Sequence, residues 1–224
     1  MKKSVVIVAG GKGIRFGGEL PKQFMPMNNK PVLMHTINAF YNCNNSFEIV
    51  VVIPENHFPL WADLCKRYNF TTPHKLVKGG STRWESVKNG LNSVDENSII
   101  GIHDGVRPLI SSALINSLYT SADSYGAVIP AIKVTDSLRV LDTNSDKSTA
   151  VNREQYRAVQ TPQVFKGNII KAAYNMPFEE VFTDDASVVE RYGVEIKIVE
   201  GEDSNIKITS AKDLIIAELL NSRV

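Results

Sequence analysis

Short runs of valine and isoleucine alternate along the chain with segments whose apolar residues recur at helical spacing. Apolar runs bounded by turn residues are typical of buried strands, and apolar positions three or four residues apart indicate amphipathic helices. The pattern predicts strands over residues 4–9, 48–53, 74–78, 98–103, 126–132 and 194–200. It predicts helices over residues 31–42, 57–69, 82–94, 112–124, 183–192 and 210–220.

Polar residues mark several of the expected helix starts. A Ser or Thr followed three residues later by an acid has the spacing of a capping box, and this spacing occurs at Thr82 with Glu85 and at Ser210 with Asp213. Thr183 is placed to cap the helix that follows it, because a hydroxyl can accept a hydrogen bond from a free backbone N–H.

The alternation of strands and helices predicts the fold class. A strand–helix repeat calls for a mostly parallel sheet with helices on both faces, and 224 residues are enough for one such α/β domain over residues 1–224. One stretch departs from this rhythm: residues 133–157 are polar, with a turn-prone centre at 142–146 and short strand-like flanks at 137–141 and 149–152. We expect a β-hairpin arm that projects from the sheet, not a second domain.

Composition narrows the class of protein. The 25 Lys and Arg against 24 Asp and Glu give a net charge of +1, which argues against a general nucleic-acid binder. Two isolated cysteines, Cys43 and Cys65, indicate reduced thiols, not a disulfide framework or a zinc site. The apolar run at residues 5–9 is too short for a signal peptide, and no run approaches the ~20 residues of a membrane span. We expect no membrane partner and a cytoplasmic location.

The segment after the first strand has the residues of a phosphate site. Glycines at positions 10, 11, 13, 17 and 18 let backbone N–H groups approach an anion closely, and Lys12, Arg15 and Lys22 add cations. A Walker A loop would need Ser or Thr at position 13, and a dinucleotide site would need a different glycine spacing and an earlier acid than Glu55. The segment therefore predicts a triphosphate site of another type, although a plain strand–helix connection stays open.

Two later strand ends support a nucleotide site at this edge of the sheet. Gly79 and Gly80 lead directly into a helix that begins near Arg83, a place where a base edge or a phosphate can bind. Asp104 follows the next strand and could hold a nucleotide hydroxyl or a hydrated Mg²⁺, with Arg107 three residues on. A local ion pair that braces the turn is the alternative for these two residues, and His103 fits a structural role.

The inventory of side chains indicates the reaction class. Cations recur at strand ends, and the list of them is Arg15, Lys22, Arg83, Arg107, Arg153 and Lys207. Phosphoryl-type transfer depends on positioning and charge stabilisation of this kind. The chain has no HExxH, no Cys/His cluster and no GxSxG elbow. Since no general base is evident, an acceptor that is itself a phosphate, and therefore already an anion, fits better than an alcohol.

The order of motifs resembles one family. Ala9-Gly10-Gly11, Pro21-Lys22-Gln23, Gly79-Gly80-x-x-Arg83-x-x-Ser86, His103-Asp104-x-x-Arg107-Pro108, Thr135-Asp136-Ser137, Arg153, the run 160–163, the run 183–187 and the run 205–209 follow the pattern of the 2-C-methyl-D-erythritol 4-phosphate cytidylyltransferases. The resemblance extends over essentially the whole chain. It implies a Rossmann-like nucleotidyltransferase domain that transfers CMP from CTP to methylerythritol phosphate and releases pyrophosphate.

The resemblance also implies roles for individual residues. The catalytic set it implies is Arg15, Lys22, Arg153 and Lys207. The nucleotide-binding set is Ala9, Gly10, Gly11, Gly13, Gly80, Arg83, Ser86, Asp104 and Arg107. The acceptor-binding set is Asp136, Ser137, Arg153, Thr183 and Lys207. In this family the arms of two subunits interlock, so a homodimer with exchanged arms is expected, in which Arg153 and Ser137 serve the partner's site. Mg²⁺ is expected on the CTP phosphates, with Asp104 a possible ligand.

The acceptor is the open part of this interpretation. The family commonly has Ala-Ala-Gly at positions 9–11, and a sister group that cytidylates ribitol 5-phosphate also has the Ala-Gly-Gly found here. Position 81, often an acid in the methylerythritol enzymes, is Ser81. The run 183–187 and the short segment 18–21 favour methylerythritol phosphate. An NAD(P)-dependent oxidoreductase and a non-catalytic nucleotide-binding module are more remote alternatives.

Overall fold

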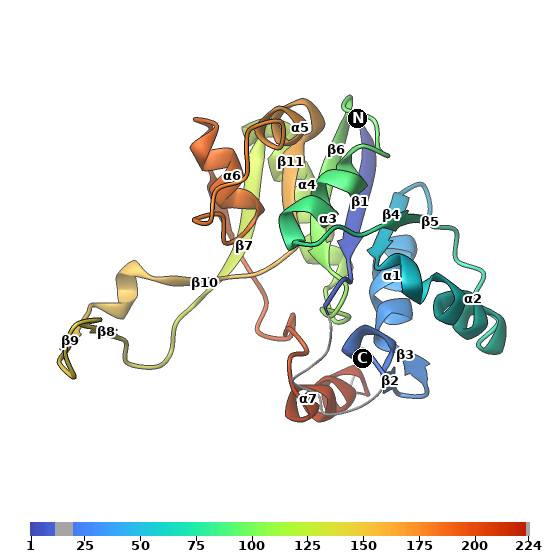
Figure 1. Ribbon diagram of the computed structural model, residues 1–224, viewed down its shortest axis with the longest axis horizontal. Coiled ribbons are helices and arrows are strands. Elements are labelled where there is room, and N and C mark those ends of the chain that lie inside the picture. Colours follow the sequence, from blue (N-terminus) through green and yellow to red (C-terminus); the bar gives the residue numbers. More distant parts are fainter. Residues whose placement is uncertain (12–19, 223–224) are drawn as a thin grey trace.

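An eight-stranded sheet forms the centre of the protein in the computed structural model, which describes residues 1–11 and 20–222 (Figure 1). Its strands are β1 (Lys2–Val8), β4 (Glu48–Ile53), β5 (Lys75–Lys78), β6 (Ser98–Asp104), β7 (Ala127–Lys133), β10 (Arg157–Val159), β11 (Gln163–Lys166) and β12 (Lys197–Glu200). They follow the order β10-β7-β11-β6-β1-β4-β5, and β12 pairs with β7. The β6-β1-β4-β5 half is parallel, whereas β11 runs antiparallel between β6 and β7.

Helices cover both faces of the sheet because successive strand residues point to opposite sides. Val5 and Ile7 of β1 pack in one core cluster with residues of α1 (Val32–Cys43), α2 (Phe58–Arg67) and α4 (Ser112–Tyr125). Val6 packs in the other with residues of α3 (Arg83–Leu91), α5 (Gly167–Ala173) and α6 (Asp185–Arg191). This arrangement is the predicted α/β class.

The C-terminal helix closes one end of the sheet. A third, smaller cluster joins Met27 of the ribbon β2 (Pro26–Met27) and β3 (Lys30–Pro31) to Ala217 of α7 (Ala211–Asn221). Ile208 is fully buried there, and its N–H donates to the Val106 carbonyl over 2.9 Å. The segment before α7 is therefore fixed beside the end of β6.

The predicted arm is a β-hairpin that extends away from the sheet (Figure 1). β8 (Arg139–Leu141) and β9 (Ser148–Ala150) pair antiparallel, and the 3-10 turn η4 (Arg153–Gln155) leads back. The free part is shorter than expected, because the ends of the predicted range belong to the sheet: Arg157 of β10 pairs with Lys133 of β7.

The strand pattern predicted the parallel elements better than the antiparallel ones. A strand lies on each predicted strand segment, but β10, β11, α5 and the short ribbon β2–β3 were not predicted. β11 has only the four residues Gln163–Lys166, and its place between β6 and β7 is determined by pairing, which no local period reveals.

Two expectations about helix starts need correction. Thr183 does not cap α6: the N-cap is Asp184, which forms a capping box with Ser187. A carboxylate there accepts the N–H of Ser187 over 2.9 Å and also interacts with the helix dipole. The capping box at Ser210 is present. At Thr82 only half of the box forms, because the Glu85 carboxylate accepts from Ser81 instead.

None of the helices in residues 1–11 and 20–222 has the length and apolar character that a bilayer-spanning segment needs.

Candidate active site

A cavity of about 290 Å³ lies at the carboxyl ends of β1 and β6, where ligands of open α/β sheets bind. Its described lining residues are Val8, Ala9, Gly10, Gly11, Lys22, Gln23, Gly80, Ser81, Thr82, Arg83, Ser86, Asp104, Val106 and Lys207. Five separate segments of the chain thus contribute to one wall. Most of the predicted nucleotide-binding residues, and two of the predicted catalytic lysines, come together here.

Backbone at two turns of the cavity is held in place by buried side chains. The Gln23 amide, which is 1% exposed, donates to the Ala9 carbonyl over 2.8 Å. The Ser86 hydroxyl accepts from the Gly80 N–H over 3.0 Å and donates to the Thr82 carbonyl over 2.9 Å. A Cβ on Gly80 would lie 2.2 Å from Glu85 Cβ, so only glycine fits this turn. Both turns therefore present main-chain groups in fixed positions.

Asp104 supplies the one carboxylate among the described residues that line this cavity. It is 8% exposed, and three cations surround it: Lys207 Nζ at 2.8 Å, Arg107 Nε at 3.6 Å and Arg83 Nε at 3.9 Å. Burial alone would raise the pKa of Asp104, but Lys207 and the two arginines more than offset this and lower it to about 2. Asp104 is therefore ionised at neutral pH.

Lys207 reaches the cavity because its two neighbours face the core. Ile206 and Ile208 pack in the cluster beneath α7, and the Lys207 ammonium between them lies 2.8 Å from Asp104 instead. The Lys207 side chain keeps 43% of its surface exposed, and its ammonium is within reach of an anion in the cavity.

Arg107 and His103 lie behind this wall. The Arg107 side chain, 9% exposed, donates to the Asn205 carbonyl over 2.7 Å, and it is not among the described residues that line the cavity. This geometry favours the bracing interpretation of Arg107, and its contact with a nucleotide stays a prediction. Desolvation lowers the pKa of the fully buried His103 to about 4, and its ring nitrogens bond to the Arg107 carbonyl and the Thr161 hydroxyl. His103 is therefore a neutral structural residue.

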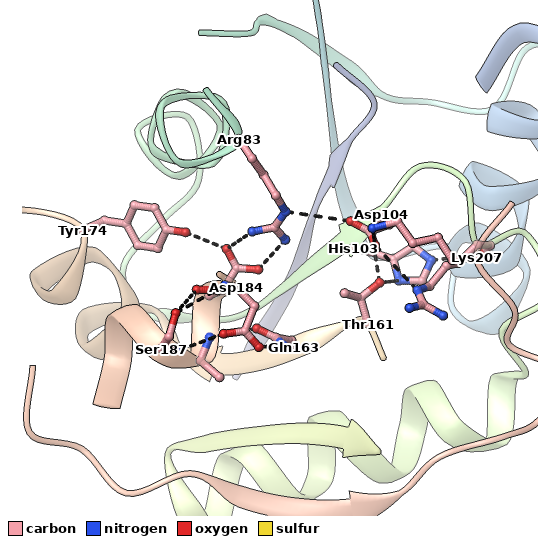
Figure 2. A network of polar contacts seen from close by, with 12 residues as sticks. Arg83, His103, Asp104, Thr161, Gln163, Tyr174, Asp184, Ser187 and Lys207 are labelled. Carbon is pink, nitrogen blue, oxygen red and sulfur yellow. Dashed lines mark hydrogen bonds and ion pairs between the residues drawn. The ribbon is translucent and has the colours of Figure 1, made fainter. Parts of the chain in front are cut away.

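Arg83 joins the cavity to a second polar cluster (Figure 2). Its guanidinium donates to both carboxylate oxygens of Asp185, over 2.9 and 2.6 Å, while its Nε lies toward Asp104. Burial by itself would lower the pKa of Arg83, but the Asp185 carboxylate raises it well above its usual value. Arg83 is thus a fixed, charged part of the wall.

Thr183 lies at a neighbouring hollow. A smaller cavity of about 140 Å³ shares Thr82 and Arg83 with the first, and its lining also includes Thr183, Asp184 and the aromatic rings of Trp84, Tyr174, Phe178 and Phe182. The predicted acceptor residue therefore sits beside the predicted nucleotide site, on the turn that leads into α6.

The remaining acceptor residues are not brought to this wall by their own chain. Asp136, Ser137 and Arg153 are exposed on the arm, and the arm lies well apart from the ends of β1 and β6 (Figure 1). The Arg153 guanidinium donates to the Thr135 carbonyl and pairs with Glu154 at 3.7 Å, both within the arm. Two further predicted residues, Gly13 and Arg15, lie outside the described part of the chain.

Sequence reasoning missed several residues of the wall. Gln23, Ser81, Thr82 and Val106 line the cavity without having been assigned to it, and Asp185 holds Arg83. Gln23 lies within the Pro21-Lys22-Gln23 motif, which gave a signal. No signal in the sequence distinguished Asp185 from Asp184, because the two residues differ only in their tertiary contacts.

The described residues fit a metal that arrives with a nucleotide. They contain no group of three or more His, Cys, Asp and Glu side chains arranged to hold an ion. Asp104 alone faces the cavity as a carboxylate, and Mg²⁺ is often held by one or two carboxylates together with substrate phosphates. A single carboxylate could approach a Mg²⁺ ion that substrate phosphates also hold, and the binding of Mg²⁺ stays a prediction.

Comparisons with known proteins identify the family. A sequence model of the 2-C-methyl-D-erythritol 4-phosphate cytidylyltransferase family matches residues 4–223. The enzyme of that name from Phocaeicola vulgatus is 48% identical over 220 residues, covering 98% of this chain and 100% of its own. The one from Bacteroides thetaiotaomicron is 47% identical over 220 residues, with coverage of 98% and 100%.

A solved structure has the same fold. The crystal structure of 4-diphosphocytidyl-2C-methyl-D-erythritol synthase from Anaerococcus prevotii matches with a TM-score of 0.82 at 29% identity, covering 98% of this chain and 95% of that one. The predicted fold class and the resemblance read from the motifs are both confirmed. By sequence over nearly its whole length and by structure, the chain belongs to the 2-C-methyl-D-erythritol 4-phosphate cytidylyltransferase family.

Proposed function

We propose that the cavity at the ends of β1 and β6 transfers CMP from CTP to 2-C-methyl-D-erythritol 4-phosphate, in the synthesis of isoprenoid precursors. The observation that carries this function is the convergence of both glycine turns, Lys22, Asp104 and Lys207 on one cavity, in a member of this family. The products are 4-diphosphocytidyl-2-C-methyl-D-erythritol and pyrophosphate.

The cavity can perform this transfer without a general base. An oxygen of the acceptor phosphate attacks the α-phosphorus of CTP, the bond between the α-phosphorus and the bridging oxygen breaks, and pyrophosphate leaves with the electron pair. Because the nucleophile is already an anion, the work of the protein is to orient it and to stabilise charge. Lys22 and Lys207 line the cavity and are placed for that work, and the turns at Ala9 and Gly80 offer main-chain groups to the cytosine. Arg15 remains the predicted third cation.

We propose that Mg²⁺ enters on the triphosphate. When bound, it neutralises part of the phosphate charge and favours departure of pyrophosphate. Asp104 lines the cavity and would be the carboxylate that approaches the ion, and Lys207 helps to keep that carboxylate ionised.

We further propose a homodimer in which each arm completes the partner's acceptor site. Two features support it: Arg153 lies on an arm that extends away from its own cavity, and the arm exposes apolar residues. Val140 is 55% and Leu141 73% exposed, a surface that a second copy of the arm or sheet could bury.

Free thiols at Cys43 and Cys65 accord with the proposed cytoplasmic location.

Pyrophosphate release tests the function directly. Purified protein with CTP and Mg²⁺ is given either methylerythritol phosphate or ribitol 5-phosphate, and we expect faster release with methylerythritol phosphate. Lys207→Ala should lower kcat/KM about 100- to 1,000-fold, as removal of one transition-state contact does. The matched control is Lys212→Ala, an exposed lysine on α7, which should leave the rate unchanged.

Two results would contradict the proposal in different ways. Faster release with ribitol 5-phosphate would reassign the acceptor and leave the cytidylyl transfer in place. Release with neither acceptor would remove the transfer function itself.

A further inference from the structure

The Arg83–Asp185 ion pair has a fully buried carboxylate, and the proposed transfer assigns no role to Asp185. Asp185 is fully buried, and its carboxylate accepts two hydrogen bonds from Arg83 and a third, over 2.6 Å, from the Tyr174 hydroxyl. A paired charge of this kind is costly to bury and is often neutral for stability compared with apolar residues. Stability alone therefore does not explain why the Asp185 carboxylate is buried with three hydrogen bonds.

The position of Asp185 is itself fixed by a layer of contacts. It is the first residue of α6, whose start is held by the Asp184–Ser187 capping box. The Gln163 side chain of β11 donates to the Asp184 carboxylate over 2.7 Å and accepts the Ala186 N–H over 2.8 Å. Tyr174 stacks on Trp84 at 5.6 Å between ring centroids. Asp185 is thus attached to the sheet on one side and to an aromatic cluster on the other.

Arg83 is the point where this support meets the cavity (Figure 2). Its Nη1 and Nη2 edge bonds to Asp185, and its Nε lies 3.9 Å from Asp104, which also pairs with Lys207 at 2.8 Å. Without Asp185, the carboxylate nearest to Arg83 among the described residues would be Asp104. A guanidinium that moved there would compete with Lys207 and enter the space of the nucleotide.

We propose that Asp185 is a positioning residue of the transfer reaction, which acts by holding the Arg83 guanidinium in the cavity wall and away from Asp104. α3 begins at Arg83, just after the turn at Gly80, and α6 begins just after Thr183. The Arg83–Asp185 pair therefore links the turn at the nucleotide cavity to the turn that carries Thr183. This inference rests on the proposed function, because the reaction that Asp185 supports is the cytidylyl transfer.

Asp185→Asn tests the inference because it removes the charge and keeps the shape. We expect kcat/KM for CTP to fall about 10- to 100-fold, by analogy with the loss of a side chain that orients a metal ligand. The fall should appear as a rise in KM and in the Kd for CTP, with kcat changed less than about threefold, because the wall is needed to bind the nucleotide. Tyr174→Phe removes only the hydroxyl, and should move the same constants in the same direction by a smaller factor.

A double-mutant cycle separates positioning from folding. If Asp185 acts only through Arg83, then Arg83→Gln combined with Asp185→Asn should be no worse for CTP binding than Arg83→Gln alone. Glu179→Gln is the matched control: Glu179 pairs with Arg191 at 2.9 Å, but on the surface near the other end of α6, and its loss should change no constant. Circular dichroism and thermal unfolding report whether each variant folds.

Two outcomes would overturn the inference: constants for Asp185→Asn equal to those of the unchanged protein, or additive losses in the cycle. Equilibrium CTP binding, measured by calorimetry without an acceptor, keeps the test independent of turnover. If the unchanged protein released no pyrophosphate, the transfer function would fail, while the binding cycle would still decide whether Asp185 positions Arg83.

Discussion

The nucleotide cavity and the arm are built in opposite ways. At the cavity, Asp104 is 8% exposed and is surrounded by three cations that the core holds in place. On the arm, Leu141 is 73% exposed, and the contacts described for Arg153 are made within the arm itself. The described wall of the cavity comes from one chain, whereas the arm extends away from that cavity.

This difference bears on the recognition of the two substrates that we propose. Charges that are fixed before binding need no reorganisation when a triphosphate arrives, which is the condition for strong electrostatic stabilisation. The strands β8 and β9 of the arm bury none of their residues, so the proposed dimer would have to position them by docking. Under the proposed arm exchange, the donor half of the reaction would depend on the fold of one chain and the acceptor half on assembly.

The largest effect is expected at the cavity, from Lys22→Ala. Removing this cation should lower kcat about 100-fold or more and weaken CTP binding far less, since it acts mainly on charge that develops in the transition state. Single-turnover kinetics measure the rate of transfer, and calorimetric titration measures the Kd for CTP. Lys78→Ala, at an exposed lysine that pairs with Glu55, is the control. Equal losses in binding and turnover would assign Lys22 to ground-state recognition instead.

The arm is tested by mixing two inactive variants. Arg153→Ala and Lys207→Ala should each lose most activity alone. When equal amounts of the two variants pair at random, half of all dimers are heterodimers. If the arms are exchanged, each heterodimer has one site in which both residues are intact. Activity should then recover to about a quarter of that of the unchanged protein after denaturation and joint refolding. No recovery would mean that Arg153 serves its own chain, or that it does not contribute to the site.

His103, behind the cavity wall, makes the stability of the folded chain depend on pH. Its pKa is lowered from 6.5 to about 4 in the folded chain, because burial disfavours the charged ring. As the pH falls below about 6.5, the unfolded chain binds a proton that the folded chain does not, so stability is lost down to about pH 4. Between pH 6.5 and 5 the loss should be about 2 kcal/mol.

Urea unfolding at several pH values measures how the free energy of unfolding changes with pH. His103→Gln keeps a side-chain donor and removes the titration, so its unfolding free energy should change less over the same range. The Asp104 pKa, lowered to about 2, contributes only below about pH 3.8 and does not overlap this window. An unchanged slope in the variant would assign the pH dependence to other groups.

The smallest effect on subunit stability is expected on the arm. Leu141→Ser should change the unfolding free energy by less than about 0.5 kcal/mol in dilute monomer, because the side chain is already exposed. The buried Leu118→Ala, in contrast, should cost about 2–5 kcal/mol. In the same Leu141 variant the dimer should dissociate more readily, measured by sedimentation velocity. A large loss of monomer stability would mean that the arm packs on its own chain.

Much of the fold followed from local pattern. The apolar runs predicted the parallel strands β1, β4 and β6, because strands buried on both faces are rich in Val and Ile. The edge strand β5, with the sequence Lys-Leu-Val-Lys, has no buried residue, but it also lies on a predicted strand segment. The glycine turns could also be located, since they follow strands and parallel strands end at one edge. Residues such as Gly80, Asp104 and Lys207 were therefore predicted to be near one another before their contacts were known.

Only the tertiary structure decided which of these residues bear on the cavity and which support it. Arg107 and Lys207 are both cations at strand ends, yet one is buried behind Asp104 and the other reaches into the cavity. Asp184 and Asp185 are neighbours, yet the first caps α6 and the second binds Arg83 across 102 positions of sequence. Sequence specifies the residue types and their order, but pairing, burial and the direction of a side chain depend on contacts between distant segments, which exist only in the folded chain.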